Sequence, residues 1–314
     1  MTYDEPIPNS PLARWSRTLA VFSVQVVLVA IVLHRLLSLP TPVALNVLVL
    51  GLAGALLAVL LALGAYVAIW RDGRMGALSA SIGLLLGLAL LGWPAALVPI
   101  YRSMPPIHDI STDMAVPPAF VALAPQRAAA GNGPAYGGTA IARQQQEAYP
   151  DIRPVIVPRP VSETWELVGE TVKRLKWKVA AEQPPGGRGK PGYIEAVDRT
   201  LILGFYDDVV VRVDGDARET RIDVRSASRF GEHDLGRNAA RIRKLFKELK
   251  VRLDETVTGS DRPRRRRGGV EKVVPKRGKG QPLALQGQKA KAGVKGSKQA
   301  GQQPKRPNRR QQQE

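Results

Sequence analysis

The 314-residue sequence contains no cysteine and only three histidines. Without cysteine the chain can form no disulfide, no thiolate nucleophile and no Cys-ligated zinc site. The histidines, at positions 34, 108 and 233, show none of the spacings of zinc-binding pairs. Walker loops, G-x-S-x-G elbows and dinucleotide-binding fingerprints are also missing. We therefore predict no metal site, no cofactor and no catalytic residue, although the absence of motifs leaves an enzymatic role open.

Charged residues are missing from two long apolar runs, residues 43–70 and 77–101, and an earlier run over residues 19–39 contains only Arg35. A hydrocarbon core of about 30 Å needs about 20 apolar residues in a helix. The runs also lack the polar stripe of a soluble amphipathic helix. They predict a head over residues 1–17 and a three-helix transmembrane anchor over residues 18–101. No carboxylate lies inside any run, which disfavours an ion-coupled transporter.

The arginines that flank these runs predict the orientation of the anchor. Four lie on one side of the predicted membrane, Arg14, Arg17, Arg71 and Arg74, and two lie on the other, Arg35 and Arg102. Cytoplasmic loops carry the excess of Lys and Arg. We therefore expect a multi-pass membrane protein, with the lipid bilayer as a partner, a cytoplasmic head and a C-terminal domain on the opposite side of the membrane.

Gly83 and Gly87 form a G-x-x-x-G pattern in the third run. Small residues at this spacing let membrane helices approach closely. The pattern predicts packing of the three helices on one another, or a homodimer through the same two glycines.

Two further segments follow the anchor. Residues 102–160 are rich in Pro, Gly and Ala and predict an extended linker. Residues 161–256 begin with a helical pattern over 161–176 and end with one over 234–253. Between them lie four strand-like segments, 177–182, 193–197, 208–214 and 221–228, with a hairpin signal at Asp214-Gly215. The predicted fold is a small two-layer α+β domain, with an antiparallel sheet and two helices.

Alternation in the last two strands predicts one buried and one polar face. Five residues are expected on the buried face: Val209, Val211, Val213, Ile222 and Val224. Four are expected on the other: Arg212, Arg221, Asp223 and Arg225. The strands are therefore predicted to be half-buried.

Positive charge is concentrated at the C-terminal end. From Asp261 onward the chain has seventeen of its 46 basic residues and three of its 27 acidic ones, in a background of Gly, Gln and Pro. Such a composition predicts a disordered tail, residues 257–314. Its basic part, residues 262–310, could bind a polyanion, whether anionic lipid, an envelope polymer or nucleic acid.

Four segments of the sequence are similar to those of a known family: IHDISTD with PPAF (107–120), YPDIRP (149–154), YIEAVDRT with GFYDDVVVRV (193–213) and RIDVRSASRFGEHDLGRNAARI (221–242). Together they resemble the bacterial family called domain of unknown function 1499, over about residues 107–253. The resemblance implies a domain that often follows membrane spans or a lipoprotein-type leader. It implies no activity.

The connection between the last strand and the last helix is the best candidate for a site. Free N–H groups at a helix start, beside glycines and arginines, can hold a phosphate or carboxylate. The candidate anion-binding residues are Arg225, Ser226, Ser228, Arg229, Asp234, Asn238 and Arg241. The competing interpretation is structural: Asp234 caps the helix, the serines close a turn, and the arginines pair with Asp223 or Glu232. Asp207 and Asp208 are adjacent on a strand, so we expect them on opposite faces.

Three functions remain open. The first is a multi-pass protein of the bacterial inner membrane that presents a small α+β binding or structural module in the periplasm. The second is an enzyme acting on an anionic envelope or lipid substrate. The third is a cytoplasmic module whose basic tail tethers nucleic acid or another polyanion to the membrane.

Overall fold

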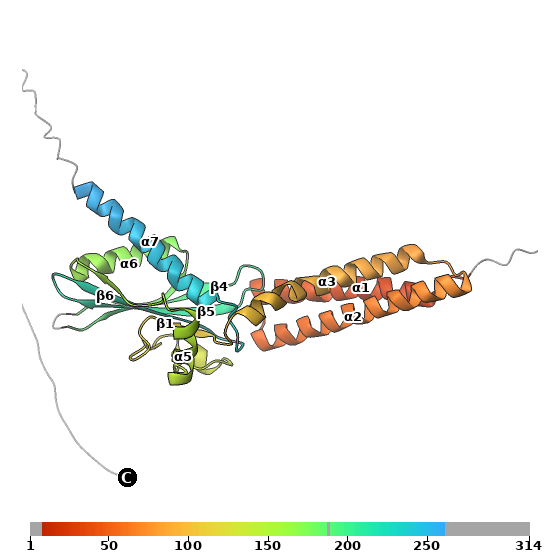
Figure 1. Cartoon of the computed structure of the whole chain (residues 1–314), viewed down its shortest axis with the longest axis horizontal. Coiled ribbons are helices and arrows are strands. Elements are labelled where there is room, and N and C mark those ends of the chain that lie inside the picture. Colours follow the sequence, from red (N-terminus) through yellow and green to blue (C-terminus); the bar gives the residue numbers. More distant parts are fainter. Residues whose placement is uncertain (1–7, 187–188, 261–314) are drawn as a thin grey trace, which may run out of the picture. The chain divides into compact units, whose positions relative to one another are not determined.

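The computed structural model describes residues 8–186 and 189–260, with side chains as far as residue 255 (Figure 1). Three long helices come first: α1 (Pro11–Leu36), α2 (Thr41–Asp72) and α3 (Ala77–Ser103). The elements that follow are β1 (Asp109–Ser111), α4 (Ala124–Ala128), α5 (Gly138–Ala148), β2 (Val155–Val157), α6 (Val161–Arg174), β3 (Lys178–Gln183), β4 (Gly192–Arg199), β5 (Tyr206–Gly215), β6 (Thr220–Ser228) and α7 (Arg237–Ser260). The predicted order of three apolar helices followed by an α+β domain is confirmed.

The helices α1, α2 and α3 run alongside one another (Figure 1), and each is long and apolar enough to cross a membrane. The Ser10 hydroxyl caps α1 by accepting a hydrogen bond from the Ala13 N–H at 3.4 Å. Gly73, at φ 66°, ends α2 in the left-handed conformation that glycine adopts without strain. The short connections 37–40 and 73–76 make successive helices antiparallel.

Small side chains fill the inside of this bundle, and large apolar ones face outward. The buried residues of α1 recur every three or four positions and are Ala13, Ser16, Ala20, Ser23, Val27, Ala30 and His34. Exposed positions include Leu50 and Trp70, whose exposed fractions are 68% and 91%. A helix bundle in water buries its large aliphatic side chains. The reversed arrangement is typical of helices surrounded by lipid.

Gly83 and Gly87 lie inside this bundle. A Cβ atom on Gly83 would lie 1.9 Å from Ser16 Oγ of α1, and one on Gly87 would lie 2.6 Å from Val59 Cγ2 of α2. Each glycine is therefore covered by a neighbouring helix of the same chain. Of the two roles predicted for the G-x-x-x-G pattern, this contact corresponds to packing of the three helices on one another.

The domain is built on a sheet with the order β1-β6-β5-β4-β3, in which β2 also pairs with β6 and every pair is antiparallel. Helices α6 and α7 lie together on one face (Figure 1). The main core lies between this face and the two helices, and contains all five strand residues predicted to be buried, Val209, Val211, Val213, Ile222 and Val224.

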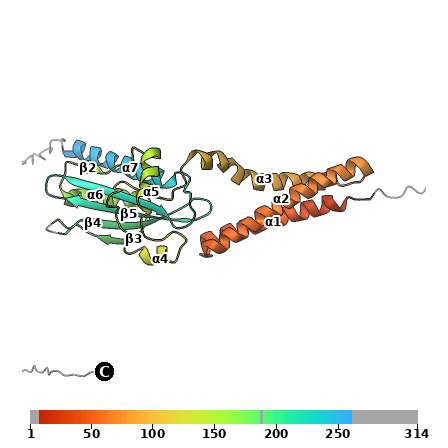
Figure 2. The same ribbon diagram turned by 60° about the horizontal axis from the view of Figure 1, so that its bottom comes forward.

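The other face of the sheet is also covered, by the segment predicted to be a linker. Within residues 102–160 the chain adds β1 and β2 to the sheet, and α4 lies on the opposite side from α7 (Figure 2). Phe120 and Leu123 pack there on Val210 and Ala227. The alternating pattern suggested a half-buried sheet because the second face carries charged residues. Two of them are buried in ion pairs, Asp223 with no exposed surface and Arg225 with 2%, whereas the Arg221 side chain remains 46% exposed.

The hairpin between β5 and β6 turns later than the sequence signal indicates. Gly215 still pairs with Thr220, so the turn consists of residues 216–219 and not of Asp214-Gly215. The Asp216 carboxylate fixes it by accepting hydrogen bonds from the N–H groups of Arg218 and Glu219, at 2.7 and 3.1 Å. An Asx-type turn of this kind competes with a two-residue glycine turn.

At the C-terminal end, α7 continues to Ser260, beyond the predicted helix end at 253. Residues 257–260, assigned to the tail by the sequence, are thus helical. The rest of the predicted tail, including its polyanion-binding part 262–310, lies outside the described residues.

Candidate functional site

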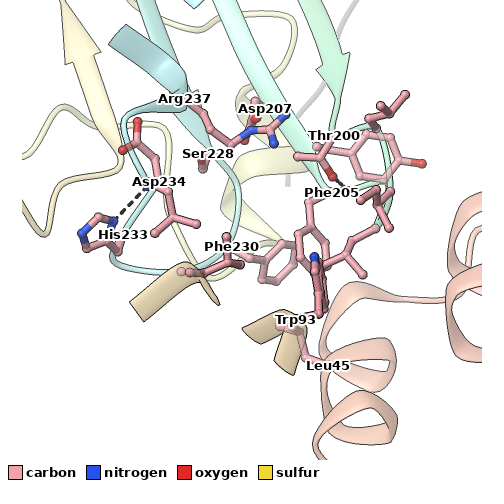
Figure 3. Close-up of a pocket in the computed structure, with 17 residues that line it drawn as sticks. Leu45, Trp93, Thr200, Phe205, Asp207, Ser228, Phe230, His233, Asp234 and Arg237 are labelled. Carbon is pink, nitrogen blue, oxygen red and sulfur yellow. Dashed lines mark hydrogen bonds between the residues drawn. The ribbon is translucent and has the colours of Figure 1, made fainter. Parts of the chain in front are cut away.

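A cavity of about 520 Å³ lies beside the connection between β6 and α7 (Figure 3). Its walls come from the ends of α2 and α3, the β4–β5 loop, and the β6–α7 connection. Most of the lining is apolar: Leu45, Trp93, Leu97, Leu201, Ile202, Leu203, Phe205, Tyr206, Phe230, Gly231 and Leu235. The polar lining residues are Thr200, Asp207, Ser228, His233, Asp234 and Arg237. Ligand pockets typically have such a volume and a few polar groups in an apolar lining.

The β6–α7 connection is shaped by a capping carboxylate. Asp234 accepts hydrogen bonds from the N–H groups of Gly236 and Asn238, both at 2.8 Å, which satisfies donors at the start of α7. Leu235 and Gly236 both have positive φ, 55° and 74°. Burial raises the pKa of Asp234 above its ordinary value, although the two N–H groups act to lower it. The capping role proposed for Asp234 is therefore present in the structure.

Behind the cap, Arg241 of α7 connects the helix to the sheet. Its guanidinium lies 2.6 Å from Asp207 Oδ2 and 2.8 Å from Asp198 Oδ2. It also donates hydrogen bonds to Ser226 Oγ and Asn238 Oδ1, at 3.1 and 2.7 Å. Burial acts to lower the pKa of Arg241, but the two carboxylates outweigh it and the pKa is raised. The cation is therefore fixed in place by internal partners.

The sheet separates the predicted site residues into two groups. Ser226, Ser228, Asp234, Asn238 and Arg241 come together on the α7 side, where Asn238 bonds both serines.

Arg225 and Arg229 lie on the other side. Arg225 forms a two-pronged ion pair with Asp109, at 2.9 and 2.7 Å, and Arg229 lies 2.8 Å from Asp208 Oδ1. Asp208 also pairs with Arg127, at 3.0 Å, and neither of these two side chains has any exposed surface. The arginines therefore pair with carboxylates other than the expected Asp223 and Glu232. Asp207 and Asp208 do face opposite ways, as expected.

Of the predicted residues, only Ser228 and Asp234 line the cavity. The sequence did not indicate its apolar walls, because they come from segments far apart in the chain. One local signal was available: the β4–β5 loop reads TLILGF, and in it Leu201 and Ile202 are 79% and 54% exposed. An apolar run in an exposed turn is unusual for a soluble domain.

Arg237 is a polar residue of the cavity that the predicted site did not include. It is the first residue of α7, it is exposed, and it lines the cavity. In the part of the chain that the structure describes, no acidic side chain pairs with it. A cation at a helix N-terminus is opposed by the helix dipole. Its position is therefore not explained by the stability of α7.

Contacts between the helices and the domain form the border of the cavity. Arg35, at the end of α1, donates a hydrogen bond to the Thr200 carbonyl at 2.9 Å, and Arg199 donates to the carbonyls of Arg35 and His34 at 3.2 and 3.3 Å. The His233 ring stacks on Tyr101 with centroids 4.5 Å apart. Among residues 8–186 and 189–260, no cluster of His, Asp or Glu could hold a metal ion.

Residues 109–249 match the family described as protein of unknown function (DUF1499). No curated protein and no solved structure matches the chain. The match starts at β1 and ends within α7, so it includes β1, α4, α5 and β2 and excludes the three apolar helices. The family match confirms, over residues 109–249, the resemblance seen in the sequence.

Proposed function

We propose that this protein is a multi-pass component of the bacterial inner membrane that holds its α+β domain at the periplasmic face, where the cavity binds an amphiphile from the bilayer. The observation that carries the proposal is the composition of the cavity. Helices suited to a membrane and loops of the domain line it together, and its polar residues, which include Asp207, Ser228 and Arg237, lie at the end away from Leu45 and Trp93 (Figure 3).

The apolar residues that line the cavity favour an amphiphilic ligand. Trp93 and Leu97 of α3 belong to a helix that can cross a membrane, and tryptophan favours the interface between lipid and water. The exposed Leu201 and Ile202 add apolar surface beside them. A ligand with an acyl chain can therefore reach the cavity from the lipid phase without crossing water.

The polar end favours an anionic head group. Arg237 supplies a positive charge without an acidic partner among the described residues, and Ser228 and Thr200 supply hydroxyl groups. The nearby carboxylates are occupied: Asp207 by Arg241, and Asp234 by two backbone N–H groups. A carboxylate or phosphate ester with one acyl chain matches this arrangement.

The periplasmic orientation rests on the arginines that flank the helices. Arg71 lies in the last turn of α2 and Arg74 follows it, on the side that also holds Arg14 and Arg17 of α1. The excess on that side favours the cytoplasm. Three crossings then leave the domain on the opposite side.

The absence of cysteine allows a direct test of orientation. Ala217→Cys lies in the exposed 216–219 turn of the domain, and Met75→Cys lies in the α2–α3 connection, where the methionine is 55% exposed. In cells with a permeabilised outer membrane, a membrane-impermeant maleimide should label the first variant and not the second. Labelling of Met75→Cys alone would place the domain in the cytoplasm and contradict the proposal.

The ligand is tested with the full-length protein in detergent, using a fluorescent single-chain fatty acid as the probe. Arg237→Gln should weaken binding about tenfold, as the loss of one charged hydrogen bond does. Arg218→Gln is the matched control, because it removes the same charge from an exposed turn away from the cavity. Equal binding by both variants would contradict the role of Arg237.

A further inference from the structure

The three apolar helices contain one side-chain amide in the middle of a membrane-spanning segment, that of Gln25 in α1. Its environment is unusual for a polar group at this depth. The side chain is exposed on the outside of the bundle, and in the described part of the chain no group hydrogen-bonds to it.

Helix geometry places Gln25 opposite the packed face of α1. The buried residues Ser23 and Val27 are each two positions away, which is about 200° around the helix axis. Ser16 and His34, each nine positions away, lie on the side directly opposite. Gln25 therefore cannot reach α2 or α3 of its own chain and faces the lipid tails.

An amide in hydrocarbon needs a hydrogen-bond partner, because lipid tails offer none. Glutamine is self-complementary, since its N–H₂ group donates and its carbonyl accepts. Two copies of one amide, related by a two-fold axis, can therefore satisfy each other. Polar side chains of this type hold membrane helices together.

The residues around Gln25 form a continuous seam suited to such a contact. One heptad before it lies Thr18 and one heptad after it lies Val32, and both are exposed. Between these positions the seam contains four large, exposed apolar side chains, Val21, Phe22, Leu28 and Val29. A repeat of seven is the spacing at which helices pack along a common seam.

We infer that the protein forms a homodimer in the membrane through the outer face of α1, with the two Gln25 amides hydrogen-bonded to each other. The occupant of this face is a second copy of the chain. The glycines Gly83 and Gly87 are not needed for it, since neighbouring helices already cover them. The inference requires that α1 crosses a bilayer, but it does not require that the cavity binds a ligand.

Cysteine cross-linking in native membranes tests this interface, because the natural chain has no cysteine to interfere. Val32→Cys lies on the seam, and Leu85→Cys on the outer side of α3 is at least as accessible, because the exposed fractions are 49% for the valine and 67% for the leucine. Mild oxidation should give a covalent dimer with Val32→Cys and not with Leu85→Cys. Dimers from both variants alike, or from Leu85→Cys alone, would overturn the proposal.

A second substitution tests the amide. Gln25→Leu added to Val32→Cys should weaken dimerisation roughly 5- to 30-fold, whereas Gln25→Asn, which keeps an amide, should retain most of it. Because Gln25 faces outward, neither change should alter the amount of protein in the membrane. Cross-linking that Gln25→Leu leaves unchanged, or cross-links only to a different protein, would refute the inference. Loss of the chain from the membrane fraction would instead contradict the proposed function.

Discussion

At the scale of single residues, the domain is unusual for the number of charges that it buries. Asp109 and Arg225 are each 2% exposed, and Asp208 and Arg127 have no exposed surface. Taking ions out of water is costly, and pairing offsets the cost only while both partners are present. These pairs therefore fix the segment 102–160 to the sheet in one arrangement, because any other position leaves a charge unpaired.

Breaking one of these pairs should destabilise the domain strongly. Asp109→Asn leaves the Arg225 guanidinium buried without a counter-ion, and we expect a loss of about 3–5 kcal/mol in the free energy of unfolding. Arg143→Gln is the control: it breaks an exposed pair with Glu147, and should change stability by less than ~0.5 kcal/mol. Chemical denaturation of the full-length protein in detergent measures both changes. Similar effects of the two variants would contradict the role given to burial.

Asp113 should make stability depend on pH. Burial acts to raise its pKa, but the N–H groups of Val116 and Ala115 and the cation of Arg212 outweigh it, and the pKa lies below the ordinary value of 3.8. A carboxyl with a lowered pKa in the folded state stabilises the fold above the ordinary pKa. This contribution is lost as the pH falls through the folded-state pKa.

The measurement is the unfolding free energy of wild type and Asp113→Asn between pH 6 and about pH 2, the range that spans the ordinary Asp value. Wild type should lose more stability than the variant as the pH falls below 3.8, so the two curves should converge. Parallel curves would show that Asp113 is not the group responsible.

At the scale of elements, the sequence predicted those helices and strands whose residues show a clear local pattern of apolar and polar side chains. The apolar runs, the helices α6 and α7, and the strands β3 to β6 all follow from hydrophobic periodicity. Residues 102–160 were expected to be an extended linker, but they contain β1 and β2. Each of these strands has only three residues, and each pairs with β6, more than 60 positions later in the chain. Short strands carry too little pattern of their own to be identified.

The candidate site was predicted only in part, for the same reason. Asp234 could be identified as a cap, because capping is a local interaction. That Asp109 would pair with Arg225, or that Trp93 would share a cavity with Phe230, depends on the tertiary fold. No spacing within the sequence contains that information.

The packing of α3 depends on one glycine. A side chain at Gly83 would meet the backbone of α1, with a Cβ atom 2.8 Å from Ser16 C and 2.9 Å from Arg17 N. Backbone atoms cannot rotate aside, so we expect Gly83→Leu to destabilise the bundle by at least about 1–3 kcal/mol.

Gly92→Leu is the matched control in the same helix, because nothing lies within 4 Å of its Cβ position. Thermal unfolding in detergent, followed by circular dichroism, should show a lower midpoint for Gly83→Leu only. Equal midpoints for the two variants would show that α1 and α3 do not pack at this glycine.

At the scale of the whole molecule, two of the three apolar helices and the α+β domain line one cavity together. Helices α2 and α3 supply part of its apolar wall, and the domain supplies its polar residues. The dimer inferred from Gln25 uses the outer face of α1, whereas the cavity is lined by α2, α3 and the domain. Dimerisation and ligand binding can therefore occur together.

The most direct test of the account is native mass spectrometry of the full-length protein extracted from its own membrane. Wild type should carry one acyl-chain amphiphile per chain. Leu97→Trp, which fills the cavity with a larger side chain, should carry none, while the Gly92→Ala control should behave as wild type. Wild-type protein without a bound amphiphile, or equal occupancy in Leu97→Trp, would contradict the proposal that the cavity binds a lipid-derived ligand.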